Sequence, residues 1–232
     1  MKSASSHLAA SICACDRPHG PRRRFLAGAA ALAAGVAAPP LLAQETVRKT
    51  RSIRNLRGLV RVNGEKVAAS APIRPGDTVV TGADGRISFV VGSDAFFLRE
   101  NSELHLESAT AGVISTLRMI TGALGAVFGK RSVGGVTLST PTVTAGIRGT
   151  GCYTEARDEG VYFCTCFGAI QLTSLNGGPE ELVVSSHHDP RRIMRDAASN
   201  NMMMIPASFG MHTDAEMDAL ERLVGRRAPW AT

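Results

Sequence analysis

Residues 136–172, VTLSTPTVTAGIRGTGCYTEARDEGVYFCTCFGAIQL, are the stretch that decides the fold class. The runs on either side of residues 157–160 are rich in β-branched and aromatic residues, which favour strands. Between them, Arg157-Asp158-Glu159-Gly160 has the polar and glycine residues of a tight connection. The stretch therefore predicts two antiparallel strands joined as a hairpin.

The same pattern of short strands and turns continues outward, from Arg54 to about Val184. Turn signals at Asn63-Gly64, Pro75-Gly76-Asp77 and Asp84-Gly85 separate β-rich runs, because glycine adopts positive φ without steric cost. Many short strands with glycine turns and little helix indicate an all-β fold, which is a sandwich, a roll or a stacked-strand solenoid.

Residues 113–129, VISTLRMITGALGAVFG, have apolar positions that also fit a helix. Gly122, Gly125 and Gly129 argue against a helix, because each glycine costs about 1 kcal/mol in a helix interior. We predict two strands here, with a turn near Thr121-Gly122.

One amphipathic helix is expected, close to the C-terminus. Thr213 and Glu216 have the spacing of a capping box, and Gly225 ends the pattern. Met217, Leu220 and Val224 share one face, which is expected to pack on the β domain.

The N-terminal residues have the layout of an export signal. Arginines precede a run of small apolar residues that ends near Ala43, and Pro39-Pro40 interrupts the run, which disfavours a membrane-spanning helix. The twin-arginine pattern of bacterial signals is matched by Arg22, Arg23, Phe25 and Leu26. We expect cleavage after Ala43 and a periplasmic or otherwise exported protein without a membrane span.

These patterns predict the organisation of the chain. The expected parts are an export signal at residues 1–43, a linker at 44–53, a β domain at 54–186, an irregular His/Met-containing segment at 187–211, and the helix with its tail at 212–232.

The charge of the expected mature chain is close to neutral. The whole sequence has a formal net charge of +6, but residues 1–43 carry five basic residues and one acidic residue. The remaining 21 Lys and Arg and 19 Asp and Glu form no basic stripe, so a nucleic-acid partner is not expected.

Three cysteines remain after the signal, which are Cys152, Cys164 and Cys166. Residues two apart on a strand point to the same face, so Cys164 and Cys166 project together. If the hairpin loop has three residues, with Gly160 in the left-handed position, Cys152 faces Cys166 and all three thiols share one patch. A shift of register by one residue moves Cys152 to the other face.

Three interpretations of these thiols stay open. Three thiolates with His187 or His188 are a ligand set for a soft or borderline metal, with Zn, Cu and Fe as candidates. A Cys152–Cys166 disulfide would suit an oxidising compartment and leave Cys164 free. Cysteine is also often an inert buried residue.

Other candidate groups point to less specific roles. His105 is interpreted as an exposed strand residue and His212 as a local partner of the helix cap. Met202–Met204 is more typical of core filling than of thioether ligands. Cys152 with a histidine and Asp189 has the parts of a hydrolase site, but its place within a strand disfavours catalysis, and no enzyme activity is expected.

An ordered set of motifs over about residues 56–175 resembles the FecR domain. Its most specific part is Thr140-Pro141 followed by Ile147-Arg148-Gly149-Thr150; the others are GLVRVNG, IRPGDTVVTGADGRISFVVG, LRENSELHL and GALGAV. The resemblance implies an all-β periplasmic domain. The best-known members of the family sense the loaded state of an outer-membrane TonB-dependent receptor and signal to a sigma factor across the inner membrane.

That transmembrane role requires a cytoplasmic anti-sigma region and a membrane-spanning helix, and we recognise neither in this sequence. The resemblance therefore implies only the binding or sensing half of the role, with an envelope protein as a possible partner and an unidentified small-molecule ligand. The Cys-x-Cys and His-His pairs are departures from the family pattern. We expect an exported binding or sensing protein related to the sensing of iron or another metal, with a candidate Cys/His metal site. The alternative is an interaction or cell-wall-binding scaffold with a structural Cys152–Cys166 disulfide.

Overall fold

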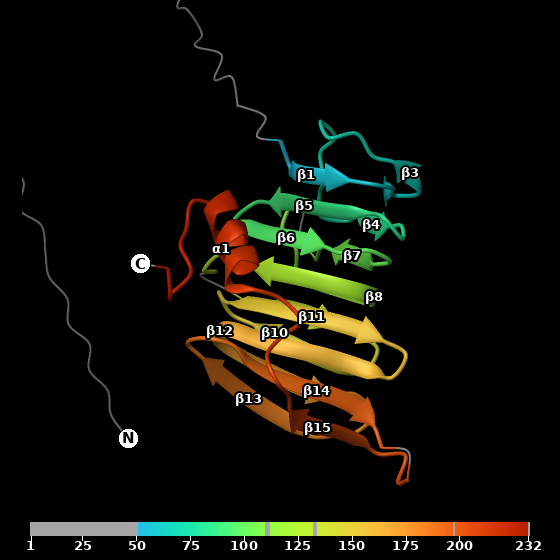
Figure 1. The fold of residues 1–232 in the computed structure, drawn as a ribbon, viewed down its shortest axis with the longest axis vertical. Helices are drawn as coiled ribbons and strands as arrows, with labels where there is room; N and C mark the ends of the chain where they lie inside the picture. Colours follow the sequence, from blue (N-terminus) through green and yellow to red (C-terminus); the bar gives the residue numbers. More distant parts are fainter. Residues whose placement is uncertain (1–50, 110–111, 132–133, 197, 232) are drawn as a thin grey trace, which may run out of the picture. The chain divides into compact units, whose positions relative to one another are not determined.

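A computed structural model describes residues 51–109, 112–131, 134–196 and 198–231. The predicted export signal, including Arg22, Arg23, Phe25 and Leu26, lies outside these ranges. The described residues form fifteen strands and one helix, which confirms the all-β prediction (Figure 1). The elements are β1 (Ile53–Arg57), β2 (Val60–Val62), β3 (Glu65–Lys66), β4 (Thr78–Thr81), β5 (Arg86–Val91), β6 (Asp94–Leu98), β7 (Glu103–Glu107), β8 (Thr116–Val127), β9 (Val136–Ser139), β10 (Val143–Ile147), β11 (Gly151–Arg157), β12 (Gly160–Ser174), β13 (Glu180–Ser185), β14 (Asp189–Arg195), β15 (Met202–Pro206) and α1 (Asp214–Leu223).

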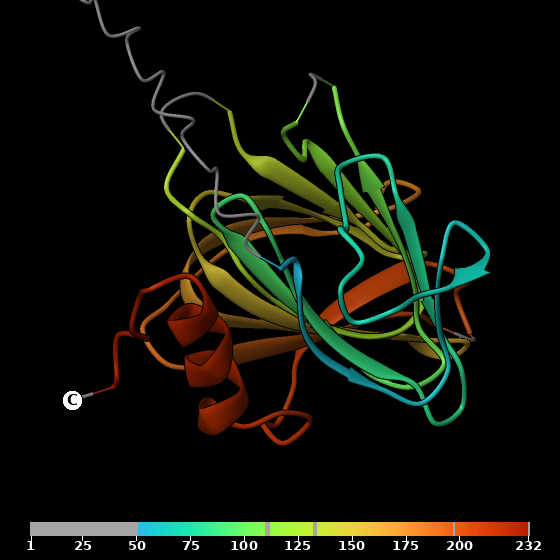
Figure 2. The same ribbon diagram turned by 90° about the horizontal axis from the view of Figure 1, so that it is seen from above.

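The strands form two layers that share two long strands. Sheet A has the order β1-β5-β6-β8-β11-β12-β14-β15. Sheet B has the order β3-β2-β4-β7-β8-β9-β10-β12-β13. The pairing of β8 with β9 is parallel, and the other pairings among the described strands are antiparallel. Seen from above, the layers curve around a common interior in a barrel-like arrangement, and α1 lies outside it (Figure 2).

The long strands β8 and β12 pass from one layer to the other at a glycine. In β8 the change occurs at Gly122, whose φ is +92°, and in β12 it occurs at Gly168, whose φ is +90°. A Cβ atom at either position would collide with Ser102 or Thr150, respectively. The turn predicted near Thr121-Gly122 is therefore wrong: the glycine bends one continuous strand instead of ending it.

The hairpin of β11 and β12 sets which way the cysteines face. Arg157 pairs with Gly160, so the loop has two residues, and Cys152 lies opposite Thr165. Of the two registers that the sequence left open, the three-residue loop that pairs Cys152 with Cys166 is not formed, because Gly160 begins β12; Cys152 faces the other side. A shift by one residue reverses the face of every side chain.

Residues 187–211 are more regular than expected. They contain β14 and β15, and β15 includes Met202–Met204. These strands extend sheet A beyond β12. The weak pattern of this segment reflects its position at the edge of the sheet, where several side chains of β15 are only half-buried.

Helix α1 begins and ends as predicted. Thr213 is the N-cap in a complete capping box with Glu216, and Gly225, with φ of +72°, follows the C-cap Val224. Among the described residues, no helix is long and apolar enough to cross a membrane.

Two apolar clusters lie on opposite sides of sheet A. The interior cluster fills the space between the sheets and includes Cys152 and Phe163. The outer cluster lies between sheet A and α1 and includes Tyr153, Cys164 and Met217. This outer cluster positions the candidate site.

Candidate metal centre

Alternation along β12 places two cysteines on the outer side of sheet A, which the residues after β15 partly cover. The side chains of Cys164 and Cys166 point to the outer side of sheet A, whereas the side chain of Phe163 points into the interior cluster between the sheets. Both cysteines are fully buried. The geometry of an extended strand is sufficient to bring these two thiols to the same surface.

The third member, His188, comes from the connection between β13 and β14. Its backbone is left-handed, with φ of +51°, and its N–H donates to the carbonyl oxygen of Cys166 at 2.9 Å. This hydrogen bond holds the connection beside β12. The His188 side chain is only 4% exposed.

The fourth member, His212, lies directly before the N-cap of α1. Its side chain is buried and stacks on Tyr153, with ring centroids 4.5 Å apart. The interpretation of His212 as a cap partner is wrong: Thr213 and Glu216 cap the helix, and the imidazole points toward the cysteines.

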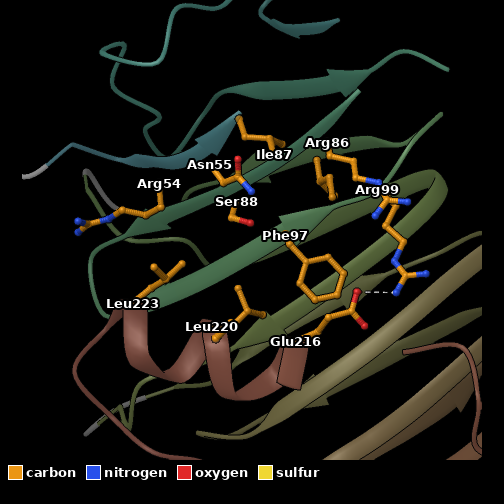
Figure 3. A pocket seen from close by; sticks show the side chains of 12 residues that line it. Arg54, Asn55, Arg86, Ile87, Ser88, Phe97, Arg99, Glu216, Leu220 and Leu223 are labelled. Atoms are coloured by element: carbon orange, nitrogen blue, oxygen red, sulfur yellow. Dashed lines mark hydrogen bonds and ion pairs between the residues drawn. The ribbon is translucent and has the colours of Figure 1, made fainter. Parts of the chain in front are cut away.

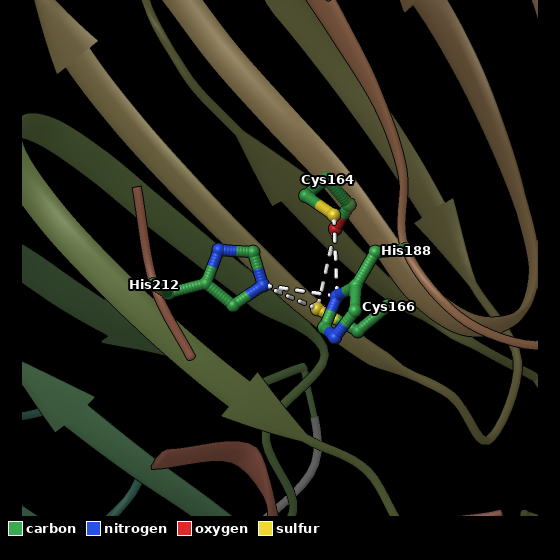
Figure 4. Close-up of side chains that lie close together, drawn as sticks. All are labelled: Cys164, Cys166, His188 and His212. Atoms are coloured by element: carbon green, nitrogen blue, oxygen red, sulfur yellow. Dashed lines mark hydrogen bonds between the residues drawn. The ribbon is translucent and has the colours of Figure 1, made fainter. Parts of the chain in front are cut away.

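The donor atoms of these four side chains converge on one point (Figure 4). Nε2 of His212 lies 3.2 Å from Sγ of Cys166 and 3.2 Å from Nδ1 of His188. Sγ of Cys164 lies 3.7 Å from the same Nδ1 atom, and the four donor atoms are all within 4.8 Å of one another. We call Cys164, Cys166, His188 and His212 the four-donor site.

These separations match a tetrahedral metal site. With Zn–N bonds of about 2.0–2.1 Å and Zn–S bonds of about 2.3 Å, neighbouring donor atoms lie about 3.3–3.8 Å apart. The observed separations of 3.2–3.7 Å are close to that range. Two thiolates with two imidazoles are a common ligand set for zinc.

Burial favours the neutral forms of His212, His188 and Cys166. It lowers the pKa of His212 to about 3 and also lowers the pKa of His188, so both imidazoles offer a lone pair at neutral pH. Burial raises the pKa of the Cys166 thiol well above its usual range, and the neighbouring Cys164 adds to the effect. A bound cation would favour the thiolate form and release that proton.

Asp214 supports the site from the first turn of α1. Its Oδ1 atom lies 2.7 Å from Nε2 of His188 and 3.0 Å from Nε2 of His187. Carboxylate contact with one ring nitrogen of His188 leaves the other, Nδ1, as the acceptor that faces the cysteines. Burial opposes ionisation of Asp214, but the two histidine hydrogen bonds outweigh it and lower the pKa of the carboxyl.

Aromatic rings enclose the four-donor site. Phe209 stacks on His188 at 4.2 Å between centroids, and Trp230 lies 4.9 Å from the same ring. Trp230 also contacts Phe167 and His187. Rings on the open side limit the access of water, which strengthens electrostatic interactions with a bound ion.

The three cysteines predicted as ligands do not lie on the same side of sheet A. Cys164, Cys166 and His188 come together as predicted, whereas Cys152 lies in the interior cluster, on the opposite side. The three cysteines are free, and the opposite orientation of Cys152 excludes the proposed Cys152–Cys166 disulfide. The same orientation separates Cys152 from the histidines of the hydrolase interpretation, and burial raises the pKa of its thiol.

His187 does not join the four-donor site. Its side chain is exposed and contacts Asp214 instead. His187, His188 and Asp214 form a second, more exposed group of three donors. His105 also stays apart: it is half-buried on β7 and pairs with Glu103.

Comparisons with known proteins assign no family to the chain. No family model and no curated protein matches it, so the FecR resemblance stays a prediction. Two solved structures, both of candidate anti-sigma factors from Parabacteroides distasonis, are similar in part. One has 8% identity and a TM-score of 0.46, and the match covers 56% of this chain and 60% of that chain. The other has 9% identity and a TM-score of 0.44, with 65% and 61% covered, so the chain spans less than two thirds of either structure.

Proposed function

We propose that this chain is an exported binding and sensing protein of the bacterial cell envelope whose ligand is a metal ion held at the four-donor site. One observation carries the metal proposal: four buried donor atoms of suitable chemistry lie within 4.8 Å of one another. Export is supported by the twin-arginine pattern at Arg22 and Arg23, and an envelope role by the sequence resemblance to FecR domains.

Zinc fits this site better than copper or iron. Two thiolates and two neutral imidazoles around Zn²⁺ give a complex with no net charge, which is the least costly state in a buried site. The same four ligands around Cu⁺ would leave one negative charge in contact with the apolar outer cluster. Iron in tetrahedral sulfur sites is usually held by four thiolates, and only two are present here.

The donor count favours binding over catalysis. A catalytic zinc ion keeps one coordination position for water or substrate, whereas a structural ion is closed by four protein ligands. The four-donor site supplies all four ligands, and aromatic rings cover it. We therefore propose no enzymatic turnover.

The test is metal analysis of the exported form, purified without affinity metals. We expect about one equivalent of zinc per chain by elemental mass spectrometry, and none in the Cys164→Ser variant. Cys152→Ala is the matched control, because it removes a buried thiol from the same sheet on its other side. It should retain a full equivalent.

Three results would contradict the proposal in different ways. Wild-type protein that binds no metal after incubation with zinc refutes the metal site. Loss of zinc in Cys152→Ala but not in Cys164→Ser would show that the ion binds in the interior cluster, and not at the four-donor site. If the protein stays in the cytosol with its signal sequence uncleaved, the proposed export is refuted, but the metal site is not.

A protein-interaction role has support from a second surface. Leu182 and Val184 on β13 are 61% and 67% exposed, and β13 pairs with β12 alone among the described strands. An edge strand with exposed apolar side chains favours pairing with another chain. If an envelope protein binds here, Val184→Lys should abolish its capture, and zinc content should stay unchanged.

A further inference from the structure

The four-donor site takes its ligands from two parts of the chain. Cys164, Cys166 and His188 belong to sheet A and its connections, whereas His212 belongs to residues 207–231, which follow β15 and include α1. We call residues 207–231 the C-terminal segment. Forty-six positions separate His212 from Cys166.

His212 reaches the other three donors of the site through one ring nitrogen, Nε2. Its imidazole is buried, and its Nδ1 atom has no hydrogen-bond partner among the described residues. Its Nε2 atom contacts Cys166 and His188, which are themselves members of the four-donor site. A metal ion would bind Nε2 directly, so the ion and the position of His212 are energetically linked, whereas Nδ1 gains no partner from the ion.

The C-terminal segment covers an apolar surface of sheet A. Met217 and Leu220 are buried against a surface that includes Phe97 and Tyr153. We call this surface the helix-covered face; its other members are Ala95, Ala123 and Val127.

Few polar contacts hold the segment in place besides the four-donor site and its neighbour Asp214. At its start, the Ala207 N–H donates to the carbonyl oxygen of Pro190 at 3.1 Å. Glu216 pairs with Arg99 at 2.7 Å across one wall of the cavity between α1 and sheet A (Figure 3). Arg226 donates to the carbonyl oxygen of Ser93 at 2.8 Å. Partly exposed pairs contribute little, and a helix of ten residues is marginal by itself.

We propose that the metal ion is the latch that holds the C-terminal segment on sheet A, so that metal occupancy regulates whether the helix-covered face is accessible. The inference rests on the proposed metal site. When hydrated Zn²⁺ binds, two Zn–S and two Zn–N bonds form, the water ligands of the ion leave, and the two S–H bonds break with release of their protons to solvent, without electron transfer. When the ion is lost, the two thiols take up protons again, His212 loses its bond to the ion, and the C-terminal segment is held less tightly on sheet A.

The experiment compares the exported form with zinc and after chelation, by hydrogen exchange and by fluorescence, on one preparation. With zinc at 100 times its dissociation constant, local opening is suppressed about 100-fold. Chelation should therefore raise the exchange of α1 amides about 10- to 100-fold, while amides of β4 and β7 that exchange through local fluctuations, and not through global unfolding, keep their rates. Trp230, the single tryptophan of the chain, packs on His188 and should shift its emission to longer wavelength.

The metal content of the same sample separates the two proposals. One equivalent of zinc with unchanged α1 exchange after its removal overturns the latch and leaves the proposed function standing. Absence of zinc binding overturns both. Equal rises in exchange over α1 and sheet B would mean general unfolding, which also overturns a local latch.

Two variants sharpen the comparison without chelator. His212→Gln removes only the ligand contributed by the C-terminal segment and should show fast α1 exchange even with zinc present. Cys152→Ala should respond to zinc as the wild type does. If His212→Gln keeps the slow α1 exchange of the loaded wild type, His212 is not part of a latch.

Discussion

At the scale of single residues, both ring nitrogens of His188 have a role. Nδ1 faces Cys164 and His212, and Nε2 contacts the carboxylate of Asp214 at 2.7 Å. The carboxylate therefore orients the ring and selects the tautomer that offers Nδ1 to a metal. Asp214 acts as a positioning residue, because its own oxygens point at histidine nitrogens instead of the thiols.

Replacement of Asp214 should weaken the metal site without removing it. We expect Asp214→Asn to bind one equivalent of zinc with about 10- to 100-fold lower affinity, as loss of a carboxylate behind a histidine ligand usually does. Competition with a chromophoric chelator measures the affinity.

Asp218→Asn is the control, since it makes the same charge change one turn further along α1. Equal affinities for Asp214→Asn and the wild type would show that the carboxylate does not orient His188. Equal losses in both variants would assign the effect to the charge of the helix.

At the scale of elements, β12 connects the two layers. Residues before Gly168 pair with β11 and β14 in sheet A, and residues from Gly168 onward pair with β10 and β13 in sheet B. The bend needs a positive φ and close contact with Thr150. Any other residue at position 168 is therefore disfavoured for two reasons: its backbone would be strained at this φ, and its Cβ atom would collide with Thr150.

Gly168→Ala should lower the free energy of unfolding by about 2–4 kcal/mol, from left-handed backbone strain and overpacking together. Gly177→Ala is the matched control: its φ is +73°, but a Cβ atom there meets nothing within 4 Å. It should cost only about 1–2 kcal/mol. Urea unfolding measures both, and equal costs would show that the contact with Thr150 does not matter.

At the scale of the whole molecule, the protein has an interior core and a second apolar layer on the outside of sheet A. The interior core needs no metal, because its members are packed side chains between the sheets. The outer layer contains the four-donor site. A ligand that binds only the folded state stabilises the whole protein by mass action.

Zinc should therefore raise the thermal unfolding midpoint. At 100 times the dissociation constant the gain is about 2.7 kcal/mol, which corresponds to about 5–10 °C for a protein of this size. Scanning calorimetry with and without zinc measures the shift. Cys152→Ala should show the full shift and Cys166→Ser none; a full shift in Cys166→Ser would assign the stabilisation to another site.

Much of the candidate site was predictable from local patterns. Cys164 and Cys166 share a face because side chains alternate along a strand, and the capping box at Thr213 and Glu216 defines the start of α1. His212 was missed because its meeting with Cys166 depends on where the helix docks. A lone histidine before a cap has no local signal for that contact.

The sequence by itself determined the fold class, the hairpin at Asn63-Gly64, where both residues have positive φ, and the ends of α1. Each depends on neighbours along the chain: strand alternation, glycine φ angles and helix caps. Only the tertiary structure decided that Cys152 faces inward, that β8 bends at Gly122 without ending, and that His212 joins Cys164, Cys166 and His188. These outcomes depend on strand register and helix docking, where a shift of one residue in a loop changes which side chains meet.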